Sequence, residues 1–242
     1  MFRAVIKFLF YRKTDRIFLY YRKRQLKRNV KIFFLLIFAS VVLLYFVVTY
    51  IAFPVKMKED AMFPFVTQGS YVLFDRLSLG IKKPYRYENA QNFFYNKKLQ
   101  RGEVVALVSP YKSRSSLFRK LLDFPLYIVT AGFIKLDKRE YLIRRVLALP
   151  GERISIRNKT IYINGNIFVP AWPLHFEDIR VLPTDVSVRD HFNEVVVPGE
   201  HVFLVNDNWD ISSDSRTLGP IPTYLLEGKY RFALFSAPPP EQ

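Results

Sequence analysis

The sequence predicts a mainly β protein, in which one antiparallel β-sheet domain follows a single transmembrane helix. The helix is predicted by residues 32–53, a run of 22 predominantly apolar residues without a charge. The sheet is predicted by short runs rich in β-branched and aromatic residues, which replace the helical period after residue 54. Turn signals separate most of these runs, and this favours antiparallel strands over a βαβ fold.

Residues 1–31 precede the apolar run and are strongly basic. They hold eleven Lys or Arg and one acid, Asp15, so +10 of the chain's net charge of +16 lies there. A helix over 32–53 is about 33 Å long and crosses a bilayer core. Because basic residues gather on the cytoplasmic side of membrane helices, we expect residues 1–31 to be cytoplasmic and the chain after Pro54 to be exported. The run is too long for a signal-peptide core and lacks a clear A-x-A cleavage site, so we expect an uncleaved anchor.

Composition excludes several kinds of chemistry. The sequence has no cysteine, which rules out disulfides, thiol nucleophiles and cysteine metal sites. His175, His191 and His201 are scattered without metal-ligand spacing, and we expect no metal and no cofactor. Most of the excess charge precedes the apolar run, so we expect a lipid membrane as partner and no nucleic acid. An apolar face at helical spacing, with Arg3 and Lys7 on the other face, fits either a helix lying on anionic lipid or a solvated charged tail; its residues are Phe2, Val5, Ile6, Leu9 and Phe10.

Strands are predicted in order along the exported part. The runs at 70–76, 103–108 and 141–149 are β-rich, and the polar residues 82–102 predict a long loop. Asn164-Gly165 is a strong signal for a type I′ hairpin turn, and Asn158-Lys159 marks the turn before it. The remaining strands are predicted within residues 152–157, 160–164, 166–169, 194–200, 201–207 and 229–235.

Two segments interrupt the β pattern. Within residues 116–134, the uncharged stretch 124–134 is too short to span a bilayer. It fits either core packing or a membrane-interface insertion within 112–140. The Pro-rich end of the chain is expected to be frayed. We therefore expect four parts: a basic cytoplasmic segment (1–31), a transmembrane anchor (32–53), an exported β domain (54–236) and a Pro-rich tail (237–242).

Four separated blocks of the sequence follow a known pattern. The first, "AMFPFVTQGSYVLF" (61–74), matches S-M-x-P-T-L-x-x-G-D at Met62, Pro64 and Gly69. The others are "RGEVVAL" (101–107), "LIRRVLALPGE" (142–152) and "NDNWDISSDSRTLGPI" (206–221). In these blocks, their order and the preceding anchor, residues 32 to about 236 resemble bacterial signal peptidase I, the leader peptidase that cuts signal peptides from exported proteins. The resemblance implies a β-sheet catalytic domain on the outer surface of the bacterial cytoplasmic membrane. It also implies signal peptides or exported preproteins as partners.

The family cuts with a serine nucleophile and a lysine general base, and both positions are substituted here. The serine position is Ala61, whose methyl group cannot attack a carbonyl. The lysine position is Arg144, whose guanidinium stays charged and cannot act as a base. Glu59 stands where a family serine helps to hold the oxyanion, and a carboxylate would repel that charge. We expect a buried Arg144 to pair with Glu59 or Asp60, with Glu59 favoured.

Other matched positions retain their residue type. Ser212 stands where a family serine hydrogen-bonds the lysine, and it completes the candidate catalytic set with Ala61 and Arg144. Asp214 and Arg216 stand where an ion pair braces the site, although they fit a purely structural pair equally well, and Pro64 is a structural position of the first block. The residues expected to bind substrate, which ordinary core packing would also explain, are Val55, Met57, Met62, Val66 and Ile143. Further departures from the pattern are Ser70, Asn206 and Trp209, in place of Asp, Gly and Arg.

These residues predict a catalytically inactive signal peptidase I homologue that binds signal peptides or other exported segments. The alternative is an active membrane serine endopeptidase with a relocated nucleophile, for which Ser212, Thr67 and Ser70 are the nearest hydroxyls in the sequence. A third interpretation is an architectural membrane protein that keeps the fold without a cleft.

Overall fold

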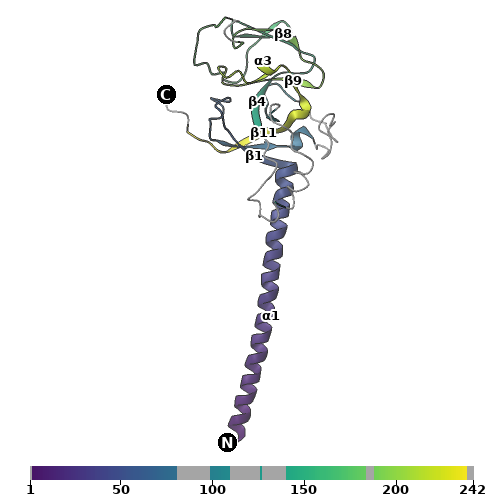
Figure 1. Ribbon diagram of the computed structural model, residues 1–242, viewed down its shortest axis with the longest axis vertical. Coiled ribbons are helices and arrows are strands. Elements are labelled where there is room, and N and C mark those ends of the chain that lie inside the picture. The colour runs from purple at the N-terminus through teal and green to yellow at the C-terminus, as the bar shows by residue number, and fades with distance from the viewer. Residues whose placement is uncertain (1, 81–98, 110–125, 127–139, 184–187, 239–242) are drawn as a thin grey trace. The chain divides into compact units, whose positions relative to one another are not determined.

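The structure is a computed structural model and describes residues 2–80, 99–109, 126, 140–183 and 188–238 (Figure 1). It divides into two compact units. Of the described residues, one unit contains 2–46 with 126, and the other contains 47–80, 99–109, 140–183 and 188–238. The first unit contributes a long helix and the second a mainly antiparallel β domain, which confirms the predicted fold class.

The first unit is dominated by α1 (Phe2–Phe46), which Figure 1 shows as one continuous helix. Its sequence contains neither glycine nor proline, so nothing breaks the backbone hydrogen-bond ladder. By length and composition, Phe18–Phe46 is able to cross a membrane. The predicted anchor extends further, to residue 53, but Ala52 and Phe53 belong to a strand. The apolar run does not reveal this boundary, because a buried strand and a membrane helix are equally apolar.

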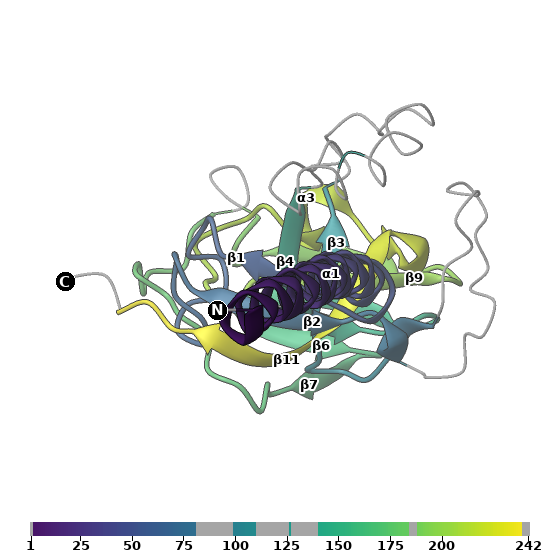
Figure 2. The same cartoon turned by 90° about the horizontal axis from the view of Figure 1, so that it is seen from below.

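The second unit begins with the short π-helical turn η1 (Val47–Ile51) and contains two antiparallel sheets. The larger sheet has the order β1-β2-β11-β3-β4-β9-β10, and the smaller has the order β7-β6-β5-β8. Figure 2 shows β1, β2, β11, β3 and β4 of the larger sheet from below. The strands are β1 (Ala52–Lys56), β2 (Tyr71–Asp75), β3 (Val104–Val108), β4 (Tyr141–Ala148), β5 (Arg153–Arg157), β6 (Thr160–Ile163), β7 (Asn166–Phe168), β8 (Phe192–Val196), β9 (His201–Val205), β10 (Ile221–Pro222) and β11 (Leu226–Phe235). The short helices are η2 (Leu77–Leu79), α3 (Ser215–Leu218) and η3 (Thr223–Leu225).

The strands predicted from β-rich runs are confirmed, and so are the two turns of the smaller sheet. Asn158 and Lys159 have φ of 49° and 64°, and Asn164 and Gly165 have φ of 53° and 80°. Positive φ at both central residues is the signature of a type I′ turn, which suits asparagine and glycine. The short strand β10 was not expected. The predicted loop 82–102 and insertion 112–140 lie almost wholly outside the described residues.

Three buried clusters form the core of the β domain. The first contains Phe53 of β1, Phe74 of β2 and Ile143 of β4, together with buried residues of the turn after β1. The second joins the smaller sheet to the loop after β9, through Ile154 and Trp209. The third lies among β3, β9 and β11. The turn after β1 and the loop after β9 are therefore both anchored in core, and these two segments carry the candidate site.

Candidate functional site

The turn that connects β1 to β2, residues 57–70, carries Ala61 and Met62. Its base is closed by two backbone hydrogen bonds: the Met57 N–H donates to the Ser70 carbonyl at 2.8 Å, and the Gly69 N–H donates to the Met57 carbonyl at 2.9 Å. Ala61 and Met62 are 1% and 0% exposed. The Phe63–Pro64 peptide bond is cis. The segment that resembles a nucleophile turn is therefore a closed, buried turn, and Ala61 has no reactive group in its side chain.

The loop after β9 lies against this turn. The Asn208 N–H donates to the Ala61 carbonyl at 3.0 Å, which ties the first and fourth sequence blocks together. The ring of His175 packs edge-on against Phe63, with 4.7 Å between ring centroids. His175 forms a short parallel bridge with Asn208. Three segments that are far apart in the sequence thus meet around Ala61.

Arg144 lies on β4 and is 3% exposed. Its Nε and Nη2 donate to the Ser213 carbonyl at 3.1 and 2.9 Å, and Nη2 also donates to the Ser213 hydroxyl at 2.9 Å. Its Nη1 donates to the Ile143 carbonyl at 2.7 Å. All of these partners are neutral oxygens, so the guanidinium is held as a hydrogen-bond donor and offers no lone pair to accept a proton.

The expected ion pair between Arg144 and Glu59 is confirmed, but it is a long contact. Arg144 Nη2 lies 3.8 Å from Glu59 Oε2, and the Glu59 side chain is 54% exposed. Burial lowers the pKa of Arg144 from its ordinary value, while the charges of Asp214 and Glu59 oppose this shift. Arginine remains protonated in proteins, so this position carries a fixed positive charge.

Asp214 and Arg216 form a fully buried ion pair where the loop after β9 enters α3. Arg216 Nε lies 3.0 Å from Asp214 Oδ1 and Nη2 lies 2.8 Å from Oδ2, and both side chains are 0% exposed. Asp214 also accepts the N–H groups of Asn206 and Arg216, and so caps α3. Arg216 donates to the Trp209 and Ile211 carbonyls at 2.8 Å each. With its hydrogen-bonding groups paired in this way, the pair fixes the loop after β9, as expected from either interpretation of the sequence.

Sequence reasoning assigned the serine beside position 144 to Ser212, but the described hydrogen bonds of Arg144 go to Ser213. Ser212 contributes its carbonyl, which accepts the Asp214 N–H at 2.9 Å and the Thr217 hydroxyl. The two serines are adjacent in "ISSDS", so the block alone does not reveal which one faces β4. Asn208, whose N–H holds the Ala61 carbonyl, was also missed, because a backbone donor leaves no trace in the residue type.

The five residues expected to bind substrate lie together in one buried cluster. Their exposed fractions do not exceed 8%, and they pack with Phe53, Val72 and Phe74. A cavity of about 360 Å³ lies nearby, lined in part by Phe65, Arg145 and Tyr230. None of the five lines that cavity. The five residues are Val55, Met57, Met62, Val66 and Ile143.

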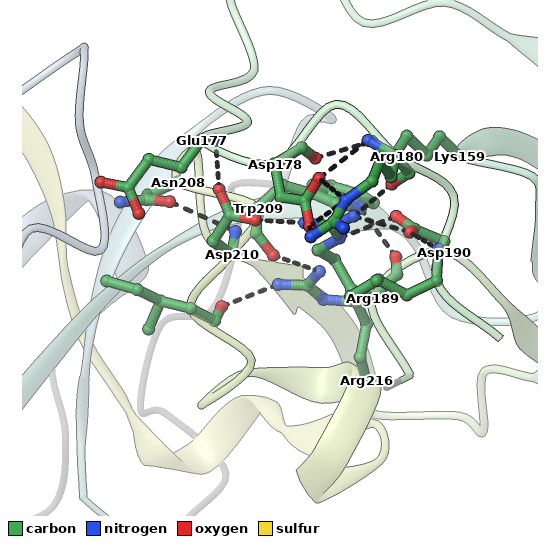
Figure 3. A network of polar contacts seen from close by, with 12 residues as sticks. Lys159, Glu177, Asp178, Arg180, Arg189, Asp190, Asn208, Trp209, Asp210 and Arg216 are labelled. Atoms are coloured by element: carbon green, nitrogen blue, oxygen red, sulfur yellow. Dashed lines mark hydrogen bonds and ion pairs between the residues drawn. The ribbon is translucent and has the colours of Figure 1, made fainter. Parts of the chain in front are cut away.

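A second polar network also contacts this loop, and Figure 3 shows it. Arg189, 3% exposed, pairs with Asp190 at 2.8 Å and with Asp210 at shorter range. Its carbonyl accepts the indole N–H of Trp209 at 2.8 Å. The Asp210 carboxylate accepts the Glu177 N–H, which ties the segment before β8 to the loop. This network restrains the same loop that presents Asn208 and Ser213.

The chemistry available at this site is limited. Acyl transfer by a serine peptidase needs a hydroxyl nucleophile and a neutral base within reach of it. Ala61 carries a methyl group and Arg144 carries a buried guanidinium, and neither side chain supplies such a group. Within the part of the chain that the structure describes, no group of three His, Asp or Glu is placed to hold a metal ion. What the site does offer is backbone, small polar groups and a fixed positive charge.

Comparison with known proteins identifies relatives along most of the chain. The family model described as "Signal peptidase, peptidase S26" matches residues 30–235. "Probable signal peptidase I-1" of Synechocystis sp. is 25% identical over 212 residues, which cover 88% of this chain and 84% of that protein. "Signal peptidase I" of Buchnera aphidicola is 22% identical and covers 88% of this chain and 78% of its own length. "Signal peptidase I V" of Bacillus subtilis is 35% identical over 83 residues, 33% of this chain and 49% of that protein. A crystal structure of a signal peptidase I from Enterococcus faecalis, 20% identical, aligns with 55% of this chain and 97% of its own, at a TM-score of 0.34.

Proposed function

Because the chain belongs to the signal peptidase, peptidase S26 family, we propose that it is a catalytically silent member that binds signal peptides or other exported segments. Membership links it to protein secretion and signal peptide processing. The proposal concerns what this chain does within that process. It keeps the domain and the loop that frame the family's site, and it lacks the two groups that carry out the cleavage.

The observation that carries the proposal is that a buried, hydrogen-bonded arginine occupies position 144. A buried lysine becomes useful as a base because burial lowers its pKa until it loses its proton. Burial also lowers the pKa of Arg144, but a guanidinium stays charged and is bonded here to Ser213 and Ile143. Together with the methyl group of Ala61, this leaves neither nucleophile nor base at the two positions.

Peptide binding is supported by the edges of the larger sheet. Among the described strands, β1 has β2 on one side only. In β4, pairing with β9 begins at Arg145, so among the described strands Leu142 to Arg144 pair only with β3. Edge strands present N–H and C=O groups that an extended peptide uses when it adds to a sheet, although at the β4 edge the Ile143 carbonyl already accepts a hydrogen bond from the Arg144 guanidinium. Both edge segments belong to the cluster that contains Val55 and Ile143, so an added strand would run beside the candidate site.

The proposed topology follows from α1 and its basic flank. An N-terminal apolar helix fits the membrane location of the family. We place residues 1–31 in the cytoplasm, the anchor within 32–53 and the domain 54–236 outside the bacterial cytoplasmic membrane, and the Pro-rich residues 237–242 follow the domain on that side. The charge excess of residues 1–31 supports this orientation. The segment 112–140 remains a proposed membrane-interface insertion.

The test combines cleavage and binding on the full chain in detergent micelles. Wild type and Ser212→Ala are incubated with a preprotein, and a fluorescent signal peptide is titrated to measure anisotropy. We expect saturable binding and no cleavage above background in either protein. Turnover by the wild type that is lost in Ser212→Ala would establish a relocated nucleophile instead.

The double variant Ala61→Ser with Arg144→Lys serves as the positive arm of this experiment, because it restores the family's two catalytic residue types. We expect it to gain measurable cleavage at the signal-peptide junction while each single variant stays inactive. Absence of saturable peptide binding in both the wild type and the double variant would contradict a peptide site and favour an architectural role.

A further inference from the structure

The chain continues to contact the β domain after β11 ends at Phe235. The last pair of the β2–β11 ladder is Tyr71 with Phe235, and two residues later Ala237 is bonded to the 57–70 turn. The Ala237 N–H donates to the Ser70 hydroxyl at 2.9 Å, and the Thr67 hydroxyl donates to the Ala237 carbonyl at 2.7 Å. The expectation of a frayed tail is therefore wrong for Ala237. Figure 2 shows the yellow end of β11 running on toward the C-terminus.

The three groups form a closed ring of hydrogen bonds. The two hydroxyl oxygens are 3.1 Å apart. Because the Thr67 hydroxyl uses its one proton on the Ala237 carbonyl, the Ser70 hydroxyl is the donor to Thr67. Every hydroxyl in the ring then donates once and accepts once. Hydrogen bonds in such a chain polarise and strengthen one another, and Ser70 is 0% exposed, so little water competes for them.

The ring is bonded to the backbone of residue 237, and the side chain of that residue lies beside the turn. Gly69, at φ 85°, faces the Ala237 methyl group: a Cβ atom placed on Gly69 would lie 3.4 Å from the Ala237 Cβ. The Ala237 methyl group therefore lies beside Gly69, and a bulky aromatic side chain at residue 237 is the change expected to crowd the turn. The neighbouring Ser236 is exposed and has no such restriction.

We infer that residues 236–238 form a strap across the 57–70 turn, and that Thr67, Gly69 and Ser70 are a docking site for an extended segment with a small side chain. The strap holds the same turn that presents Ala61 and Met62, so the order of the candidate site depends on a segment at the other end of the domain. Ser70 is one of the positions where this chain departs from its family's pattern. The inference holds whether or not the candidate site binds peptide.

Amide hydrogen exchange of the full chain in detergent micelles tests the strap. The variants are Ser70→Ala, which removes the ring, and Ala237→Phe, which displaces the small side chain; Ser236→Phe is the control of equal bulk. One hydrogen bond contributes about 1 kcal/mol, which corresponds to roughly fivefold in an opening equilibrium. We expect the amides of residues 57–70 to exchange at least roughly fivefold faster in both variants. The hairpin 153–163 and the Ser236→Phe control should stay at wild-type rates.

Three results would overturn the strap: unchanged exchange at 57–70 in both variants, an equal acceleration in Ser236→Phe, or an equal acceleration in the hairpin 153–163. The last of these would show general destabilisation in place of a local contact. Thr67→Ser keeps the hydroxyl and should exchange like wild type, whereas Thr67→Val, which keeps the shape and removes the donor, should match Ser70→Ala.

Discussion

The contact between Glu59 and Arg144 allows a prediction about how the buried positive charge of Arg144 is tolerated. The perturbation is a cycle of Glu59→Gln, Arg144→Lys and both together. Were Glu59 the main partner of a buried charge, its removal would cost about 3–5 kcal/mol. The structure argues otherwise, because the two side chains are 3.8 Å apart and Glu59 is 54% exposed. Ion pairs of this exposed kind contribute about 0–1 kcal/mol.

Arg144 itself should matter more than its charge partner. Its hydrogen bonds to the Ser213 carbonyl and hydroxyl and to the Ile143 carbonyl are 2.7–3.1 Å long. A lysine ammonium cannot reproduce the planar fork that makes them. Loss of even one hydrogen bond to a charged group costs about 1.5–3 kcal/mol. We therefore expect Arg144→Lys to destabilise by at least that amount, and Glu59→Gln by less than about 1 kcal/mol.

The assay is urea unfolding of the full chain in detergent, followed by tryptophan fluorescence. The two tryptophans, Trp172 and Trp209, both lie in the β domain and report on its unfolding. The coupling energy from the cycle should stay below about 1 kcal/mol. A loss above about 3 kcal/mol in Glu59→Gln would refute this reasoning. It would mean that Glu59 closes over Arg144 as its essential counter-ion.

Three further predictions address topology, acidity and binding. Protease added outside intact cells should digest residues 54–236 and spare 1–31; protection of the β domain would reverse the orientation. Burial acts to raise the pKa of Asp190, but hydrogen bonds from Arg189 and a backbone N–H outweigh it and hold that pKa below its ordinary value. A depressed folded-state pKa stabilises above about pH 4 and loses this effect as the pH falls further, so Tm should drop between pH 4 and pH 3 by less in Asp190→Asn than in wild type. Because the Arg144 side chain occupies the Ile143 carbonyl in the edge part of β4, Arg144→Met should bind the fluorescent signal peptide more tightly than wild type, and weaker binding would show that the guanidinium contacts the peptide.

The sequence predicts most strands of the β domain because their signals are local. The alternating run before Asn158 and the Asn164-Gly165 turn fix the smaller sheet through residue type and φ. The strand β1 was hidden, since Ala52 and Phe53 continue an apolar run that began in a helix. Whether such residues leave the helix is decided by packing, and Phe53 stacks on Phe74 with 5.8 Å between ring centroids. That contact joins two segments with a turn between them, and no local pattern records it.

In the candidate site, too, some residues were predicted from the sequence and others were not. Ala61 and Arg144 were singled out because the pattern that the sequence resembles has a serine and a lysine at the matching positions. Ser213 was missed because its role depends on which of two neighbouring serines turns toward β4. Ala237 was missed because its bonds to Thr67 and Ser70 use its backbone. Residue type therefore shows which reactive side-chain groups are absent from a matched position. Which groups hydrogen-bond to one another depends on the tertiary structure.

The surroundings of position 144 explain why arginine is tolerated there. Among the acids of the loop, Asp214 acts on the charge of Arg144, but its carboxylate is already used by Arg216 and by the Asn206 N–H. The charge of Arg216 also acts to lower the pKa of Arg144, against the opposing effect of Asp214. Arg144 therefore donates its hydrogen bonds to neutral acceptors, the Ser213 carbonyl and hydroxyl and the Ile143 carbonyl, and Glu59 adds only a long ionic contact. The Asp214–Arg216 ion pair has no net charge, and the acceptors around position 144 are neutral. Such surroundings favour a side chain that can give up its proton, as a buried lysine does. An arginine at this position keeps its proton and must satisfy it with the same oxygens, so the loop that would position a base instead holds a permanent donor.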